Sequence, residues 1–276
     1  MTDTFMSCEE KFFNRFKLNK SVTEKPFALD NGTLMHIGLE RYYRLLAEGA
    51  SFKERKDKMH SDIDFAYASE DSDMQSHEVT RLHEVVDECQ TFWRVRDERM
   101  TIKAVESPFA YKLHENADFI LMMMGKIDLM VDEDNFIDLP YDHKSYQREF
   151  PTKRLANQFI NYAHATNSNY LFVNKVGFQT SLPPEKKYRR ISLAFDPLFI
   201  EQWRQNMIKV AYRYLECEAE GVWIKNFTSC DKYGRLCEYH ELCNSSGEDA
   251  RIYKLQTDFK TLPPWDVSSS LSKSKE

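Results

Sequence analysis

The sequence lacks long hydrophobic runs. The longest, Phe119–Met124, is far shorter than the ~20 residues that a membrane-spanning helix needs. Asp3, Glu9 and Glu10 interrupt the first residues, so the apolar core of a signal peptide is also missing. No Gly-x-x-x-x-Gly-Lys-Ser/Thr motif occurs, which excludes a motor of that type. These absences predict an intracellular, cytoplasmic protein that has no contact with a membrane.

An excess of basic charge is also missing. The net charge of −6 argues against a protein that coats DNA non-specifically, although a local basic groove would suffice for binding. The basic residues nearest to one another in the second half of the chain are Lys186, Lys187, Arg189 and Arg190. They would form such a groove, or they would line a solvated strand edge.

The cysteines include no Cys-x-x-Cys pair of the usual zinc-binding form. Three of them lie close together near the end of the chain: Cys230, Cys237 and Cys243. An intracellular chain does not rely on disulfides, so metal binding is the better interpretation. His240 would complete a zinc site locally. Cys8, in a Ser7-Cys8-Glu9-Glu10 capping box at a helix start, would instead complete a four-cysteine set suited to a [4Fe-4S] cluster.

Apolar periodicity predicts an α/β fold with a mixed central sheet flanked by helices. Helices are expected over residues 33–47, 78–96, 154–165 and 197–220, and strands over 101–113, 119–131, 136–144, 169–176 and 188–195. Residues 119–131 are expected to form buried strand, and the polar residues 51–76 a mobile excursion. Residues 1–260 are expected to form one domain, and the Ser/Lys-rich residues 261–276 a disordered tail.

The apolar strand 126–131 contains one carboxylate, Asp128. A buried, unpaired carboxylate is costly, and a divalent cation removes that cost. A short polar turn leads to the next strand, which contains Asp142 and Lys144. Because side chains alternate across a strand, Asp142 and Lys144 share one face, and a hairpin would bring Asp128 to it.

Two carboxylates and one ammonium suit phosphodiester hydrolysis. The carboxylates would hold Mg²⁺ or Mn²⁺, which polarises the phosphate and activates water, and Lys144 would orient or deprotonate that water. The alternative is that Asp142 and Lys144 form an ordinary ion pair at the surface of an edge strand.

Four other residues are candidates for the same centre. His36 lies in an apolar helix and would be either a metal ligand or a hydrogen-bonded core residue. Glu106 would face the metal or stand exposed at a strand end. Gln158 and Tyr162 are one helical turn apart and point the same way.

The order of these motifs is more specific than any one of them. The series consists of Cys8, His36, Glu106, Gly125-x-x-Asp128, Asp142-x-Lys144, Gln158-x-x-x-Tyr162 and the three late cysteines. It resembles the RecB-type branch of the PD-(D/E)XK nuclease superfamily. Within that branch it is similar to the iron-sulfur exonucleases, which include CRISPR-associated and AddB-type enzymes, and to phage recombination nucleases. The resemblance implies a restriction-endonuclease-like core with a C-terminal cysteine cluster.

The resemblance also implies a role for each residue. The metal ligands would be His36, Asp128, Asp142 and the backbone carbonyl of His143, with Glu106 near them. Lys144 would be the catalytic lysine, and Gln158 and Tyr162 would contact DNA or support that lysine. The cluster ligands would be Cys8, Cys230, Cys237 and Cys243. Six residues separate Cys230 from Cys237, where the more familiar pattern has two, which keeps Zn²⁺ as an alternative.

The implied function is that of a metal-dependent exonuclease acting on single-stranded DNA or DNA ends in phage or prokaryotic recombination or repair. Without a motor of its own, it would work alone or with a helicase, a recombination protein or a single-strand-binding protein. Two alternatives stay open: a non-catalytic DNA-binding or assembly subunit on the same fold, and a zinc-stabilised structural protein with incidental carboxylates.

Overall fold

A computed structural model gives the fold, and it describes residues 1–22, 27–69, 75–147, 156–232 and 235–263. The chain forms two compact units. Residues 26–204 make up the first, which we call the sheet unit, and residues 1–25 and 205–275 the second, which we call the terminal unit. The long helix α8, Pro197–Glu220, begins in the sheet unit and continues into the terminal unit.

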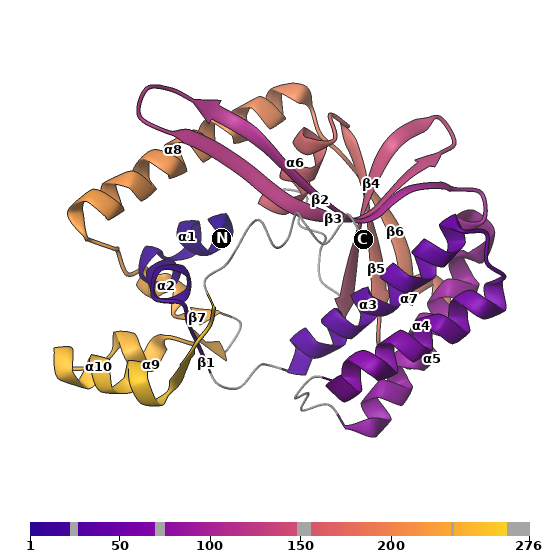
Figure 1. Cartoon of the computed structure of the whole chain (residues 1–276), viewed down its shortest axis with the longest axis horizontal. Helices are drawn as coiled ribbons and strands as arrows, with labels where there is room; N and C mark the ends of the chain where they lie inside the picture. Colours follow the sequence, from indigo (N-terminus) through magenta and orange to yellow (C-terminus); the bar gives the residue numbers. More distant parts are fainter. Residues whose placement is uncertain (23–26, 70–74, 148–155, 233–234, 264–276) are drawn as a thin grey trace. The chain divides into compact units, whose positions relative to one another are not determined.

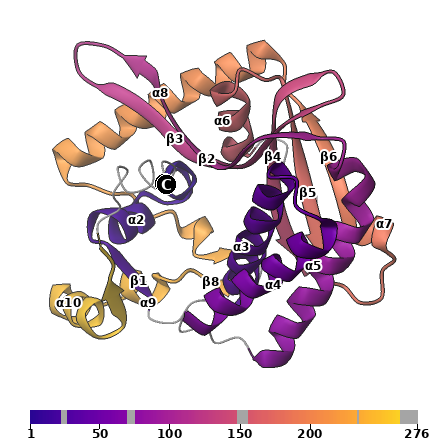
Figure 2. The same ribbon diagram turned by 45° about the vertical axis from the view of Figure 1, so that its right-hand side comes forward.

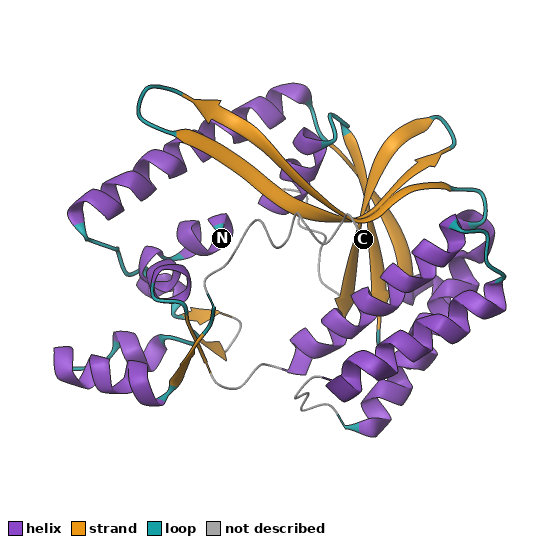
Figure 3. Cartoon of the chain, in the orientation of Figure 1, coloured by secondary structure: helices purple, strands orange, loops and turns teal. Residues whose placement is uncertain are grey.

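A five-stranded mixed sheet forms the centre of the sheet unit, in the order β2-β3-β4-β5-β6 (Figure 3). The strands are β2 Thr101–Glu115, β3 Ile120–Glu133, β4 Phe136–Tyr146, β5 Tyr170–Gly177 and β6 Tyr188–Ala194. Strands β4 and β5 are parallel, and the other neighbouring pairs are antiparallel. This mixed sheet flanked by helices confirms the predicted α/β class.

Three helices cover one face of this sheet, α3 Phe27–Ala47, α4 Phe52–Ser69 and α5 Ser76–Asp97 (Figure 1). Their buried side chains share a core with alternate residues of β3 and β4, among them Leu129 and Tyr141. The short helix α6, Asn157–Ala165, lies on the opposite side (Figure 2). A further short helix, α7 Pro184–Lys187, precedes β6.

The expectation of a mobile excursion at residues 51–76 is wrong for most of its length, because α4 occupies Phe52–Ser69. Met59 and Ile63, one turn apart, are fully buried, while the exposed positions of the helix are mostly charged. Gly38 lets the helices approach closely, since a Cβ atom there would lie 2.7 Å from Ile63 Cδ1. The apolar stripe of this helix is so narrow that the polar composition of the segment concealed its helical periodicity. Residues 70–74 lie outside the described part.

The apolar run Phe119–Met124 is not a buried strand, which corrects the expectation from the sequence. Ile120 and Met122 are 57% and 45% exposed. Strand β3 pairs with β4 between Leu129 and Glu133, whereas its earlier residues pair with β2 in a two-stranded arm. Both views show this arm extending past the other strands (Figures 1 and 2). A run of apolar residues predicts a strand, but it does not show whether other helices or strands pack on that strand and bury it.

Two of the four basic residues near β6 are buried in ion pairs, whereas Lys186 is exposed and Arg189 is partly buried. Lys187 is buried and bonded to Glu88. Arg190 is buried against the carboxylate of Asp97, which is itself fully buried. Lys187, directly before β6, and Arg190, within it, therefore connect this part of the chain to α5.

The terminal unit joins the two ends of the described chain. The N-terminal elements are α1 Thr2–Ser7, α2 Glu9–Phe12, a π-helical turn at Phe13–Lys17 and β1 Lys20–Val22. The C-terminal elements are a 3₁₀ turn at Phe227–Ser229, β7 Asp231–Lys232, β8 Arg235–Leu236, α9 His240–Cys243, α10 Glu248–Thr257 and β9 Phe259–Thr261. Strands β1 and β9 pair antiparallel, and Arg251 of α10 bonds Glu10 of α2.

The capping box expected at residues 7–10 does not form. Cys8 is the N-cap of α2, in extended conformation at φ −166°, and no side chain caps the helix. Helix α1 ends immediately before it at Ser7. The expected disordered tail, 261–276, lies mostly outside the described residues, since residues 264–276 are not described. Among the described helices, none is both long enough and apolar enough to cross a bilayer.

Replacing Arg190 by Met should lower the free energy of unfolding by about 3 kcal/mol or more, because it leaves the carboxylate of Asp97 buried without its partner. Arg44→Met is the matched control, since Arg44 forms an exposed pair with Glu40 and should change stability by less than about 0.5 kcal/mol. Urea unfolding followed by circular dichroism measures both. Equal midpoints for the two variants would contradict the role given to Arg190.

Candidate metal centre

The centre lies where two neighbouring strands part. Strands β3 and β4 are paired up to Leu129 and Tyr141, and beyond that pair β4 continues along β5 instead. The backbone N–H of His143 therefore loses its place in the β3 ladder. It donates instead to Asp128 Oδ2 at 2.7 Å. A carboxylate of one strand thus caps the backbone of the other at the point of divergence.

Three carboxylates lie in one row across three strands. The register that pairs Val105 with Leu129 puts Glu106 opposite Asp128, and the pairing of Leu129 with Tyr141 puts Asp142 on the other side of Asp128. Glu106 has φ 51°, in the left-handed region that costs a non-glycine residue about 1 kcal/mol or more. Such strain is typical of a position that the surrounding structure needs.

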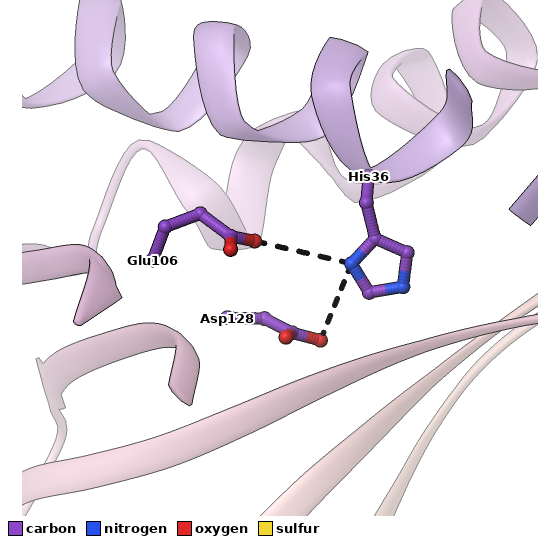
Figure 4. A group of neighbouring side chains, drawn as sticks. All are labelled: His36, Glu106 and Asp128. Carbon is purple, nitrogen blue, oxygen red and sulfur yellow. Dashed lines mark ion pairs between the residues drawn. The ribbon is translucent and has the colours of Figure 1, made fainter. Parts of the chain in front are cut away.

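His36 of α3 completes a group of three ligand atoms (Figure 4). Its Nδ1 lies 3.6 Å from Asp128 Oδ2 and 3.9 Å from Glu106 Oε1. Its Nε2 donates to the backbone carbonyl of His143 at 3.0 Å. A neutral imidazole that donates through Nε2 presents a lone pair at Nδ1. Three hydrogen-bond acceptors then face one point, which requires either a proton on Nδ1 or a cation.

The charges of this group are strongly perturbed. Burial, and next the charge of Asp142, raises the pKa of Asp128 to about 7. Burial also raises the pKa of Asp142, against the opposing effect of Lys144. Burial alone would lower the pKa of His36, but Glu106 and Asp128 raise it above its usual value. Burial opposes it, but His36 and Lys126 lower the pKa of Glu106 below its usual value. Asp128 and Asp142, in contrast, need more positive charge than their neighbouring side chains supply.

Lys144 and two residues of α6 hold Asp142. The ammonium of Lys144 lies 2.9 Å from Oδ1 and 2.8 Å from Oδ2 of Asp142, and about a third of this lysine side chain is exposed. Gln158 donates one amide hydrogen to Asp142 Oδ1 and the other to the hydroxyl of Tyr162. That hydroxyl donates to the backbone carbonyl of Lys126 at 2.6 Å. The pair at i and i+4 on α6 thereby connects the two strands that have parted.

The backbone of His143 contacts the residues of the centre, whereas its ring packs away from them. The ring stacks on Tyr43 with centroids 5.6 Å apart, and its Nδ1 accepts a hydrogen bond from Asn174. Burial lowers the pKa of His143 well below its usual value, so the ring is neutral. Tyr43 and His36 lie two turns apart on α3, so one helix fixes both the ring and the carbonyl of His143.

A family model of the PD-(D/E)XK nuclease superfamily matches residues 2–244, which include every residue of this centre. The chain belongs to the PD-(D/E)XK nuclease superfamily. Members of this superfamily are nucleases that depend on divalent metal ions. No curated protein matched the chain in a second comparison.

The donor set of this PD-(D/E)XK protein fits a divalent cation. Carboxylate oxygens are the preferred ligands of Mg²⁺ and Mn²⁺, and an imidazole nitrogen is accepted by first-row transition metals. His36, Glu106 and Asp128 offer ligand atoms that all lie within 4.8 Å of one another. A cation there would neutralise the buried carboxylates and take the lone pair of His36.

The ligand set implied by the resemblance differs from this group in two respects. The structure brings Glu106 together with His36 and Asp128, while Asp142 is bonded to Lys144 and Gln158. The carbonyl of His143 accepts the N–H of His36. Asp142 and this carbonyl as metal ligands therefore remain predictions, as do the assigned roles of the other residues.

Several residues at the centre were missed from the sequence. Lys126 forms an ion pair with Glu106, and its place between Gly125 and Asp128 was a usable signal. Asn174 is fully buried in a mostly apolar strand, next to the buried Lys175, and a polar pair in such a strand was also a signal. No feature of the sequence indicated the contact of Tyr43 with His143, because these residues are far apart in the chain.

Gly125, the first residue of the Gly-x-x-Asp motif, is needed for packing. A Cβ atom here would lie 2.7 Å from Cζ of Phe109, whose ring covers the glycine from β2. That ring meets Tyr162 edge-on, with centroids 5.9 Å apart. Glycine at this position thus lets an aromatic ring support the Gln158–Tyr162 pair.

We expect Gly125→Ala to destabilise the protein by about 1–3 kcal/mol, because the added methyl group displaces the ring of Phe109. The double variant Gly125→Ala/Phe109→Ala should be more stable than the sum of the two single changes predicts, since the methyl group then has room. Urea unfolding of the four proteins gives the coupling. Additive changes in the free energy of unfolding would show that the ring of Phe109 is not the reason why position 125 needs glycine.

In the terminal unit, the four predicted cluster cysteines line one cavity of about 140 Å³: Cys8, Cys230, Cys237 and Cys243. All four are free thiols and half-buried. The backbone N–H of Asn226 donates to Cys8 Sγ at 3.4 Å, and Lys11 and Lys225 also line the cavity. His240, the alternative zinc ligand, lines it as well and bonds Glu241 through Nδ1.

Proposed function

We propose that this PD-(D/E)XK protein is a DNA exonuclease, dependent on Mg²⁺ or Mn²⁺, that hydrolyses the phosphodiester bonds of single strands or DNA ends. The observation that supports it best is the convergence of three acceptors from His36, Glu106 and Asp128 beside Lys144. A structural protein gains nothing from such a buried, acidic group. A hydrolase uses it to bind a cation and a phosphate at one point.

The residues of the centre would have different roles in hydrolysis. A divalent cation bound here supplies Lewis acidity, which polarises the phosphate and lowers the pKa of a bound water. Lys144 is partly exposed and held by Asp142, so it can orient the attacking water or take its proton. Gln158 and Tyr162 keep Asp142 and the backbone of Lys126 in place, which preserves the geometry that transition-state stabilisation needs.

The exonuclease assignment rests on the motif series, which is similar to that of RecB-type iron-sulfur exonucleases. A small nuclease with no nucleotide-binding motor motif suits recombination or repair in a prokaryotic or phage-infected cytoplasm. A helicase, a recombination protein or a single-strand-binding protein would deliver its DNA. Comparison of end-labelled linear DNA with circular single strands tests the exonuclease mode, because an exonuclease leaves the circle intact.

Replacing Asp142 by Asn should reduce cleavage by roughly 10³-fold or more, because several kcal/mol of transition-state stabilisation depend on this carboxylate. Mn²⁺ should also raise the unfolding temperature of the Asp142→Asn protein less than that of the wild type. Asp138→Asn is the control, since Asp138 is an exposed carboxylate on the same strand whose φ of 52° asparagine tolerates. Normal cleavage by purified Asp142→Asn protein in Mn²⁺ would refute the assignment. A wild-type protein that binds DNA but never cuts it would instead favour the non-catalytic subunit.

We also propose that Cys8, Cys230, Cys237 and Cys243 hold a [4Fe-4S] cluster that joins the N- and C-terminal segments. Their common cavity supports this, because about 140 Å³ is far more space than a single ion fills. In the described residues, no three of these sulfurs lie within 4.8 Å of one another, as one tetrahedral Zn²⁺ with 2.3 Å bonds would require. Thiolates bound to separate irons lie farther apart. The N–H of Asn226 and the nearby lysines suit the negative charge of such a cluster.

Anaerobically purified protein should be brown and contain iron, and Cys8→Ser should lose most of that iron. The control is Cys217→Ala, because Cys217 lies in the same unit but does not line the cavity; it packs against aromatic side chains and its thiol bonds Glu9. Iron, zinc and sulfide analysis together with the visible spectrum measures the outcome. Zinc without iron in the wild-type protein would replace the cluster by a zinc site.

A further inference from the structure

The β2–β3 arm presents one face that nothing in the described structure covers. Within the arm, Lys112 pairs with Met122, Ala110 with Met124, and Pro108 with Lys126. On β3 the alternate residues Ile120, Met122 and Lys126 are exposed and Met124 between them is half-buried, and the exposed residues of β2 include Ala110 and Lys112. Antiparallel pairing and alternation put these side chains on one face.

The opposite side of the arm is attached to α6. Phe109 meets Tyr162, and the hydroxyl of Tyr111 donates to Asn161 at 2.6 Å. The ring of Tyr111 also stacks on His164, with centroids 4.8 Å apart. The arm is therefore supported from α6, and its exposed face has a defined orientation.

The exposed face leads directly to the metal centre. Asp128 and Lys126 are two residues apart on β3, and Met122 and Ile120 continue the same alternation. At about 3.3 Å per residue, Met122 lies roughly 20 Å along the strand from Asp128. A surface with apolar side chains at 120 and 122 and lysines at 112 and 126 thus extends from the carboxylates to the end of the arm. Lys112 forms an exposed ion pair with Glu115, and Lys126 forms an ion pair with Glu106, so each ammonium has to leave a carboxylate to meet a phosphate.

We infer that this face binds the single-stranded DNA next to the phosphate that is cut, an inference that rests on the proposed nuclease function. Exposed Met and Ile side chains offer contacts to the flat faces of bases, while Lys112 and Lys126 offer ammonium groups to phosphates. A duplex stacks its base faces inside and would have to be unstacked to use the same contacts. Because the chain as a whole carries a net charge of −6, it does not attract DNA over long distances, and binding depends on local contacts such as these.

Lys126 links this face to the metal centre. Its ammonium pairs with Glu106, whose other oxygen faces His36. Positive charge bound between His36, Glu106 and Asp128 would repel that ammonium and compete for Glu106. Lys126 then becomes free for a phosphate, so metal and DNA should each strengthen the binding of the other.

The test is fluorescence anisotropy of the full-length protein with a labelled 20-nucleotide single strand in EDTA, where no cleavage consumes the probe. Ile120→Asp/Met122→Asp should raise the Kd about tenfold or more, because it removes base contacts and adds repulsion of phosphates. Ile137→Asp is the matched control, since Ile137 is an exposed apolar residue of β4 outside the arm and should change the Kd less than twofold. Urea midpoints near that of the wild type verify that both variants are folded.

The outcomes separate this inference from the proposed function. Unchanged single-strand affinity of the arm variant, or no single-strand binding by the wild type, overturns the inference. A loss of affinity for blunt duplex without a loss for single strands also overturns it, and makes the arm a duplex contact. A selective loss of single-strand binding supports it even if the wild type does not cut DNA, which would refute only the nuclease function. Lys126→Met should in addition abolish any gain in affinity on adding Ca²⁺.

Discussion

The divergence of β3 and β4 is the constraint on which the centre depends. Where two strands part, backbone groups of both lose their ladder partners, and each must be satisfied in another way. Asp128 accepts the free N–H of His143, and Tyr162 donates to the free carbonyl of Lys126. The residues at the metal centre are thus also the residues that stabilise the fork, which explains why the site lies here and not elsewhere on the sheet.

The same fork concentrates negative charge in a poorly solvated place. Three carboxylates lie side by side, and Asp128 has its pKa raised to about 7. Lys144 and Lys126 offset part of this charge from opposite sides of the row. Both lysines are partly exposed, so each can exchange a carboxylate for a phosphate when a cation binds. Charge balance at the centre would therefore couple a bound cation, the two lysines and a substrate phosphate.

The terminal unit solves a different problem, that of bringing together segments more than two hundred residues apart. Closing so long a loop costs conformational entropy, which local contacts must offset. The pairing of β1 with β9, the Glu10–Arg251 ion pair and an aromatic core around Phe12 all contribute. A metal cluster on the four cysteines would add covalent bonds to these weak contacts.

The sequence by itself determined the α/β class, the strands that carry Asp128, Asp142 and Lys144, and the common face of the last two, because strand periodicity and chain order are local properties. It did not show that residues 52–69 form a packed helix, nor that Phe119–Met124 lies in an exposed arm, since both depend on what packs above them. The stacking of Tyr43 on His143, the ion pair of Lys126 with Glu106 and the need for glycine at Gly125 were decided by tertiary structure alone. Each depends on residues from different elements, whose distances are set only when the sheet and its helices are assembled.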